Sequence, residues 1–438
     1  MATALLDSLL QQTDAAAASE PDWLIAARDQ ARADLARDGV PAPRNEAWKY
    51  TSLRALGART LAAHDENAAN HALSDLDLHL PGVAVPRLVF VNGVYRADLS
   101  ELVDIEGLRV QSLASVLISD AEVLRERLGR HFDQASQVFA RLNTALVEDG
   151  LVVDVAAGAK ITQPLHIVFA GAAAQTEMAW SARLLVELGE DSRLQLIEHY
   201  VAEAGTTHVG NVVGQHVLHA RAELDLLQIQ LCAESATLIR HSEMKLESDA
   251  QMRMHSIEAG AQLMRHDLQV ALNGDRSRFE SHGVFSLHGR QHSDTQLDVR
   301  HQARDTSCNV LWRGVADERS RGVFRGAITV AVGADGSDAQ LSNKNLLLSA
   351  QAEIDTQPAL EIYADEVKAA HGATVGQLDD QALFYLRTRG LPRAEARALL
   401  TLAFCGEVID TLPNDELREY LGALLLARLP QTVEAPAA

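Results

Sequence analysis

Four segments of the chain alternate apolar and polar residues: RLQLIEHY (193–200), AELDLLQIQ (222–230), QMRMHSIEA (251–259) and RFESHGVFSL (278–287). This alternation predicts β-strands, because successive side chains of a strand point to opposite faces. Strand-turn-strand units centre on Asp191, Arg221, Asp249, Asp275, Asp305 and Asp335. The successive spacings of these positions are 30, 28, 26, 30 and 30 residues. The chain therefore repeats a strand-turn-strand unit without repeating its residue identities.

A sustained period of this length distinguishes between two all-β architectures. An immunoglobulin-like sandwich would give shorter spacings and no larger period. A β-solenoid needs a repeated unit, since each rung stacks only on its neighbours. We therefore expect a mainly β protein with a β-solenoid core over residues 148–370.

The segments on either side of this core have different patterns. Residues 1–147 mix helical spacing with one predicted strand and an Asn92-Gly93 hairpin turn, so we expect a helical or mixed α/β domain. Residues 371–438 predict helices: one ends at Gly390, one begins at Pro392 and one is capped by Asn414. Because a solenoid exposes unpaired backbone groups at both ends, we expect these domains to cap it.

Composition excludes several classes of function. The chain has 438 residues, 47% of them hydrophobic, and a formal net charge of -21, which disfavours nucleic acid and anionic membranes as partners. No signal peptide or membrane-spanning run is predicted. Cys232, Cys308 and Cys405 lie far apart, which argues against a disulfide framework and against a self-contained zinc or iron–sulfur site. A reducing cytoplasm fits this cysteine usage best.

The familiar catalytic motifs are missing: no phosphate-binding loop, nucleophile elbow, HExxH or dinucleotide fingerprint is present. We therefore expect a protein that is not an enzyme. Histidine is frequent, with 17 residues of which 11 fall between His199 and His301. Pairs three or four residues apart in a strand point to opposite faces or stand about 13 Å apart, so they are poorly placed to share a metal. We interpret these histidines as polar residues on solvated or partner-facing rungs.

The segment EIYADEVKAAHGATVGQLDDQALFYLRTRG (361–390) presents one histidine, His371, where the strand-rich region ends. Gly372 and Gly376 predict tight or left-handed backbone beside it, and Gln377 to Asp380 predict a capped helix start. A side chain at such a junction can reach outward while its backbone stays fixed. His371 is therefore the candidate functional residue.

Three separated segments resemble one family, the SufB/SufD scaffold proteins of SUF iron–sulfur cluster assembly, and within it the SufD subunits. They are GVPAPRNEAWKYTSL (39–53), SRGVFRGAITVAVGADGSDAQLSNKNLLLS (320–349) and PALEIYADEVKAAHGATVGQLDDQALFYLRTRG (358–390). The resemblance implies a right-handed parallel β-helix between a mixed N-terminal domain and a C-terminal helical domain. The same arrangement was expected from the residues alone: the core from the repeat, and the flanking domains from their helical patterns.

The resemblance also implies partners and a site. A SufD subunit pairs edge to edge with SufB and binds the SufC ATPase through its C-terminal helical domain. The sequence leaves open whether the isolated chain forms a homodimer through the same edge. His371 then matches a histidine that contributes, with SufB, to binding iron or a nascent iron–sulfur cluster, and Pro358 matches an interface proline. Participation of a reduced flavin in the complex is a further implication. No histidine alone can hold a cluster, so a partner has to complete the ligands.

One position departs from the pattern. Some family members have a cysteine two residues before the histidine, whereas this chain has Ala369. The missing cysteine favours a SufD-type subunit over its paralogue SufB, which remains the alternative. A carbohydrate-active β-helix enzyme is a third alternative, although such enzymes are commonly secreted.

Overall fold

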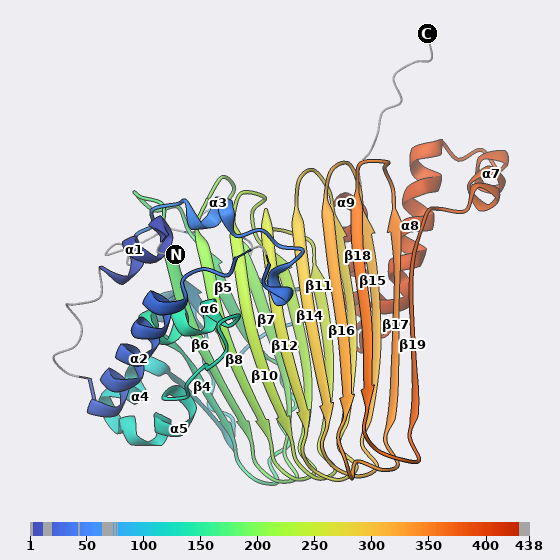
Figure 1. Ribbon diagram of the computed structural model, residues 1–438. Helices are drawn as coiled ribbons and strands as arrows, with labels where there is room; N and C mark the ends of the chain where they lie inside the picture. The colour runs from blue at the N-terminus through green and yellow to red at the C-terminus, as the bar shows by residue number, and fades with distance from the viewer. Residues whose placement is uncertain are drawn as a thin grey trace.

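A computed structural model of the protein describes residues 3–11, 20–42, 44–63 and 78–428, together with Leu73 and Leu76. Two long sheets dominate it (Figure 1). The ten-stranded sheet contains β1 (Arg87–Val91), β2 (Val94–Tyr95), β5 (Leu165–Gly171), β7 (Arg193–Ala202), β9 (Glu223–Leu231), β11 (Gln251–Glu258), β13 (Arg278–Leu287), β15 (Ser307–Ala316), β17 (Asp338–Leu347) and β19 (Lys368–Gly376). The nine-stranded sheet contains β3 (Leu108–Ser112), β4 (Asp149–Val155), β6 (Ala179–Leu188), β8 (Val209–Leu218), β10 (Thr237–Leu246), β12 (Leu263–Leu272), β14 (His292–His301), β16 (Arg321–Val330) and β18 (Glu353–Ile362).

The chain winds between the two sheets, so from β4 to β19 each strand pairs in parallel with the strand two positions along. The result is a parallel β-solenoid of about 8 turns, which confirms the predicted core. The right-handed sense implied by the family resemblance stays a prediction. The predicted turns also lie where expected: Asp191, Arg221, Asp249 and Asp305 have positive φ angles of 57–61°, which allow the chain to reverse between the sheets.

Apolar side chains fill the space between the sheets, which we call the lumen. Alternate residues of every strand point into it, as Leu194 and Leu196 of β7 do, and these residues form one continuous core. Aromatic rings stack within it, with Phe169 and Tyr200 at a centroid distance of 5.2 Å. Because parallel strands pair in register, a side chain of one rung lies directly over its counterpart in the next, about 4.8 Å away.

The N-terminal helices cover the outer face of the nine-stranded sheet (Figure 1). The predicted helical segments are confirmed, as is the hairpin turn between β1 and β2. Leu142 of the last helix packs with Val209 and Ile239 of the sheet, and Leu24 packs with Val152 and Leu185. The elements are α1 (Ala4–Leu10), α2 (Asp22–Asp38), η2 (Glu46–Trp48), α3 (Arg54–Gly57), η4 (Ala97–Leu99), α4 (Leu113–Asp120), η5 (Ala121–Leu124), α5 (Arg125–Leu128) and α6 (Val138–Leu146).

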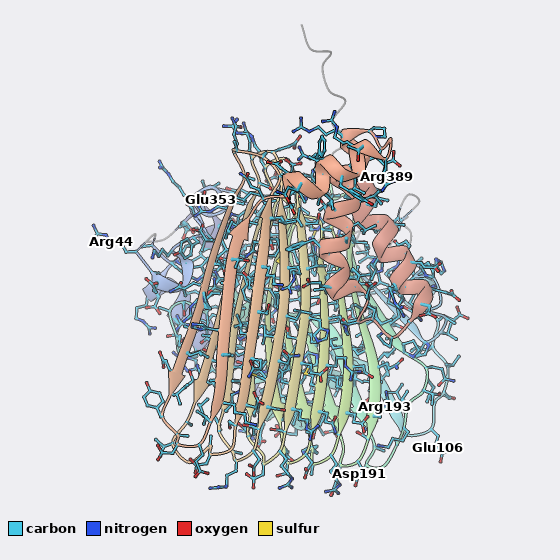
Figure 2. All side chains as sticks on the ribbon, turned by 90° about the vertical axis from the view of Figure 1, so that its right-hand side faces the viewer. Arg44, Glu106, Asp191, Arg193, Glu353 and Arg389 are labelled. Carbon is cyan, nitrogen blue, oxygen red and sulfur yellow. The ribbon has the colours of Figure 1, made fainter. Side chains whose placement is uncertain are left out.

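Three helices follow the solenoid: α7 (Asp380–Thr388), α8 (Arg393–Ile409) and α9 (Asp415–Arg428). Their predicted caps are present: Asp379 accepts a hydrogen bond from the Gln381 amide, and Asn414 accepts one from the Leu417 amide. The apolar faces of α8 and α9 lie on the outer face of the ten-stranded sheet (Figure 2). The leucine-rich run of α9 therefore packs within its own chain.

The strands extend past both expected limits of the solenoid. β1 pairs in parallel with β5, and β3 pairs with β4, so residues before 148 add strands to both sheets. At the other end β19 continues to Gly376, six residues beyond the expected boundary at 370. The glycine-rich composition of this segment resembles a linker, but its backbone pairs with β17 along its whole length.

The interpretation of the histidines as solvated or partner-facing is wrong for most of them. Eight of the 11 between His199 and His301 are buried: His199, His208, His216, His241, His255, His266, His282 and His301. Some lie in the lumen and others lie on outer faces that helices cover. A strand pattern predicts which side chains share a face, but it does not predict which faces distant helices will cover.

Candidate functional site

The last rung of the solenoid leaves two strand edges open. Among the described strands β19 pairs only with β17, and β18 only with β16, so each has a row of backbone groups facing away from the sheet. Figure 2 shows this free end, with the C-terminal helices lying along one face rather than across the open edges. Open edges of this length are pairing surfaces for another strand.

His371 lies within β19, so its expected place at a junction after the strands is wrong. Neither Gly372 nor Gly376 has a positive φ angle, and neither makes a turn. A Cβ atom at either glycine would meet no other atom within 4 Å. The two glycines share one face of this edge strand and leave it bare, and the exposed imidazole of His371 lies on the other face.

Register places His371 opposite Pro358. Leu341 of β17 and Gly326 of β16 approach across the lumen, since a Cβ atom on Gly326 would lie 2.4 Å from Leu341 Cδ1. His371 is in register over Leu341, and Pro358 is in register over Gly326. The two residues selected from the sequence thus face each other across the mouth of the lumen, on the rung that has no successor.

Apolar side chains surround this mouth. Ile362 is the last residue of β18, Tyr363 follows it, and Val375 lies near the end of β19; their exposed fractions are 43%, 60% and 42%. Clusters of exposed apolar groups beside an open sheet edge are typical of a protein–protein interface. The free end therefore combines unpaired backbone, apolar contacts and one imidazole.

Within the described part of the chain, no three His, Cys, Asp or Glu side chains converge so as to hold a metal ion. Ala369 occupies the position of the family cysteine and packs partly against the lumen core. Burial raises the pKa of the Cys232, Cys308 and Cys405 thiols to about 12, so none of them is a thiolate ligand near neutral pH.

The C-terminal helices divide into an anchored pair and a projecting helix. Thr411, between α8 and α9, is hydrogen-bonded through its hydroxyl to His255 Nε2 at 2.9 Å and to His282 Nδ1 at 2.7 Å. By contrast α7 has no buried residue, and its Phe384 and Tyr385 are 68% and 58% exposed. The helix was predicted from its cap and apolar spacing, but its exposure depends on where α8 docks, which no local pattern shows.

The N-terminal motif WKYT (48–51) fastens the first domain to the solenoid. The Arg265 guanidinium lies over the Trp48 ring at 4.4 Å, and Trp48 Nε1 donates to the Ser136 carbonyl at 2.9 Å. Thr51 donates to the Asp294 carboxylate, which also accepts from Arg265. The motif therefore has a structural role, joining the first domain to the solenoid.

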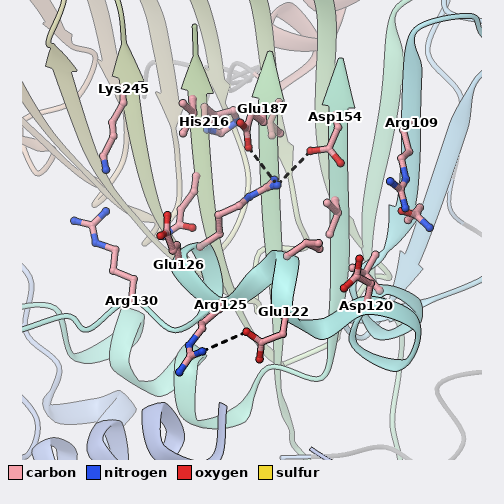
Figure 3. Close-up of a pocket in the computed structure, with 18 of the residues that line it drawn as sticks. Arg109, Asp120, Glu122, Arg125, Glu126, Arg130, Asp154, Glu187, His216 and Lys245 are labelled. Atoms are coloured by element: carbon pink, nitrogen blue, oxygen red, sulfur yellow. Dashed lines mark hydrogen bonds and ion pairs between the residues drawn. The ribbon is translucent and has the colours of Figure 1, made fainter. Parts of the chain in front are cut away.

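A cleft of about 750 Å³ lies between α4–α5 and the outer face of β4, β6, β8 and β10 (Figure 3). Its charges mostly satisfy one another: Arg127 bridges Asp154 at 3.2 Å and Glu187 at 3.4 Å, and Arg125 pairs with Glu122 at 3.3 Å. No phenylalanine, tyrosine or tryptophan lines it. It therefore does not suit a flavin ring, for which apolar and aromatic walls are usual.

Fold and site together define a class: a β-solenoid with one open end, an exposed imidazole at the mouth of its lumen, and helices on the outer faces of both sheets. Comparison with known proteins agrees. The family models of the SufBD core domain of SUF-system FeS cluster assembly and of the SufBD N-terminal region match residues 169–404 and 2–167. None of the described helices is both long and apolar enough to cross a membrane.

Two of the similar relatives match this chain over at least 90% of both sequences. An iron-sulfur cluster assembly SufBD family protein of Synechocystis is 31% identical, covering 91% of this chain and 90% of its own. Iron-sulfur cluster assembly protein SufD of Escherichia coli is 30% identical over 90% of this chain and 91% of its own. Iron-sulfur cluster assembly protein SufB of Bacillus subtilis is 22% identical, covering 77% and 74%.

The chain belongs to the SufBD family of iron–sulfur cluster assembly proteins. It is more similar to the E. coli SufD than to the B. subtilis SufB. Family membership favours an assembly protein over the carbohydrate-active alternative.

Proposed function

We propose that this chain is a SufD-type, non-enzymatic scaffold subunit that pairs with SufB through the free end of its solenoid. The observation that carries the proposal is the position of His371 on the rung without a successor, facing Pro358 across the lumen mouth. One strand edge from each sheet is open there, and apolar side chains surround them. A partner with its own open rung could pair with both edges and bury the apolar groups.

His371 would then supply one ligand to iron or to a nascent iron–sulfur cluster, which is the cargo of the complex. A neutral imidazole is a suitable iron ligand, but a cluster needs several ligands, so SufB has to provide the others. Ala369 contributes no thiolate beside it. In this arrangement the site exists only while the two subunits are paired.

The test is co-expression of this chain with SufB and SufC, followed by measurement of iron and acid-labile sulfide in the purified complex. His371→Ala should lower both while leaving the complex intact. His288→Ala is the matched control, since His288 lies on a distant turn beside Glu234. Full cluster content in an intact His371→Ala complex would reject the role of His371.

SufC would bind the projecting helix α7. Phe384 and Tyr385 are large apolar side chains that their own chain leaves exposed, on an element with no buried residue. Replacing both with serine should abolish capture of SufC without unfolding the solenoid, whereas serine at exposed Leu102 and Val103 in the N-terminal domain should not. Retained capture by the α7 variant would place the SufC contact elsewhere.

The same purified proteins also test two alternatives. In the absence of SufB, the free end could pair with a second copy, and light scattering of the isolated chain would then show a homodimer. A SufB-type role would instead require cluster ligands that lie within this chain. A flavin has no step in the proposed function.

A further inference from the structure

Three polar side chains lie in the lumen next to the free end: Asn343 and Asn345 of β17 and Thr356 of β18. Both asparagines are buried, with exposed fractions of 0% and 2%. In register beneath them lie Trp312 and Gly314, which line the lumen core. We call Asn343, Asn345 and Thr356 the lumen clamp.

The lumen clamp joins the two sheets. The Thr356 hydroxyl of the nine-stranded sheet donates to Asn343 Oδ1 of the ten-stranded sheet at 2.7 Å. Asn345 Nδ2 donates to the same Oδ1 at 2.6 Å. It also donates to the backbone carbonyl of Thr374 in β19 at 3.0 Å. One connected set of hydrogen bonds thus reaches both edge strands.

These contacts fall close to the two residues of the site. Thr356 stands two positions before Pro358 in β18, and Thr374 stands three positions after His371 in β19. Each edge strand has a ladder on one side only, so its other side gains no backbone hydrogen bonds. Edge strands of this kind open more readily than central ones. The hydrogen bonds from Asn343 and Asn345 to the two edge strands are therefore an added constraint on where His371 and Pro358 lie.

If stability depended only on filling the lumen, apolar side chains would be favoured at positions 343 and 345 over the carboxamides of asparagine. Elsewhere the lumen of these last turns holds apolar residues such as Phe324 and Leu341. A buried amide costs free energy unless it is hydrogen-bonded, and apolar residues of similar size would fill the same space. A connected polar set instead fixes one geometry, because each member loses its partners when a strand shifts.

We propose that the lumen clamp is a set of positioning residues that fixes the distance from His371 to Pro358 at the free end. The inference rests on the proposed function of His371. It adds that the ligand geometry is set from inside the solenoid, by residues that touch neither the cargo nor the partner.

The test uses Thr356→Val, which replaces the hydroxyl with a methyl group of similar size, and Thr356→Ser, which retains the hydroxyl and loses the methyl. Hydrogen–deuterium exchange of the isolated chain should quicken in β18 and β19 for Thr356→Val by about fivefold, the equivalent of one hydrogen bond. Exchange in β14 and β16 should not change, and Thr356→Ser should match the parent. Asn345→Ala should quicken exchange in β19 in the same way. Unchanged exchange in both edge strands for both variants would overturn the clamp.

A second readout separates this inference from the proposed function. In the complex with SufB and SufC, Thr356→Val should lower iron and sulfide, and Thr356→Ser should restore them. If His371→Ala lowers the cluster content while Thr356→Val does not, the positioning role is rejected and the role of His371 stands. If His371→Ala has no effect, the proposed function fails, and exchange alone then decides whether the clamp holds the edge strands.

Discussion

Buried histidines should make this protein sensitive to mild acid, and His166 of β5 tests this most directly. Its side chain is 1% exposed and stacks on His199 with ring centroids 5.6 Å apart. Burial lowers the pKa of His166 to about 3, with a smaller contribution from repulsion by His199 and Arg87. Neither ring nitrogen has a hydrogen-bond partner among the described residues.

The direction in which stability changes with pH follows from which state, folded or unfolded, binds the proton. In the unfolded chain His166 has an ordinary pKa of about 6.5, so below that pH the unfolded state takes up a proton that the folded state refuses. Stability is therefore lost as the pH falls below about 6.5. At pH 5.5 the loss from one such histidine is about 1.4 kcal/mol, and at pH 7.5 it is close to zero.

His166→Phe removes this loss and keeps a ring against His199. Urea unfolding followed by circular dichroism should show the variant more stable than the parent by about 1.4 kcal/mol at pH 5.5, relative to their difference at pH 7.5. At pH 7.5 it should be no less stable, because two unpaired buried nitrogens are gone. Identical pH dependence in the two proteins would refute the reasoning.

His219→Phe is the control of opposite sign. Hydrogen bonds that the imidazole donates to the Glu187 and Glu247 carboxylates raise the pKa of this half-exposed turn histidine, despite some loss of hydration. A raised pKa adds stability that is present below pH 6.5 and lost as the pH rises through the folded value. The control should therefore be the less stable protein at pH 5.5.

Three further predictions follow from packing and burial. Gly283→Ala should lower stability by about 1–3 kcal/mol in thermal melts, because its Cβ atom would lie 2.3 Å from Trp312 Cε2; an unchanged melting temperature would contradict the close approach. Thr51→Val leaves the buried Asp294 carboxylate with one donor fewer and should cost about 1–3 kcal/mol, seen as faster proteolysis of the N-terminal domain. Cys308, with its pKa raised to about 12 by burial, should react with a maleimide at pH 8 only after denaturation, and rapid labelling of the folded chain would show that the lumen is accessible.

Local patterns in the sequence were sufficient to predict the strands, turns and helix caps, but not the tertiary contacts around them. The turns at Asp191 and Asp249 were predictable because a reversal between sheets needs left-handed backbone at a fixed period. The caps Asp379 and Asn414 were predictable because each bonds within its own first turn. Such features depend on neighbours close in the chain.

Features that depend on distant segments were not predictable in the same way. The glycines beside His371 suggested a turn, yet pairing with β17 outweighs their local preference. Alternation could not show that His371 and Pro358 face each other, because that follows from how two sheets are stacked. The polar neighbours Asn343 and Asn345 had no signal in the sequence, since nothing local distinguishes a buried amide from a solvated one.

The order of strands has a consequence for how the molecule is made. Every hydrogen-bonded neighbour of a solenoid strand lies a full turn away in the chain, so a newly synthesised strand has to wait for the next strand but one before both of its sides are satisfied. While the solenoid is being synthesised, the last rung formed always has one unpaired strand edge in each sheet. Each new turn pairs with these edges and leaves its own edges unpaired. Among the described residues no later strand pairs with β18 and β19, and a protein that docked there would take the place of one more turn of the solenoid.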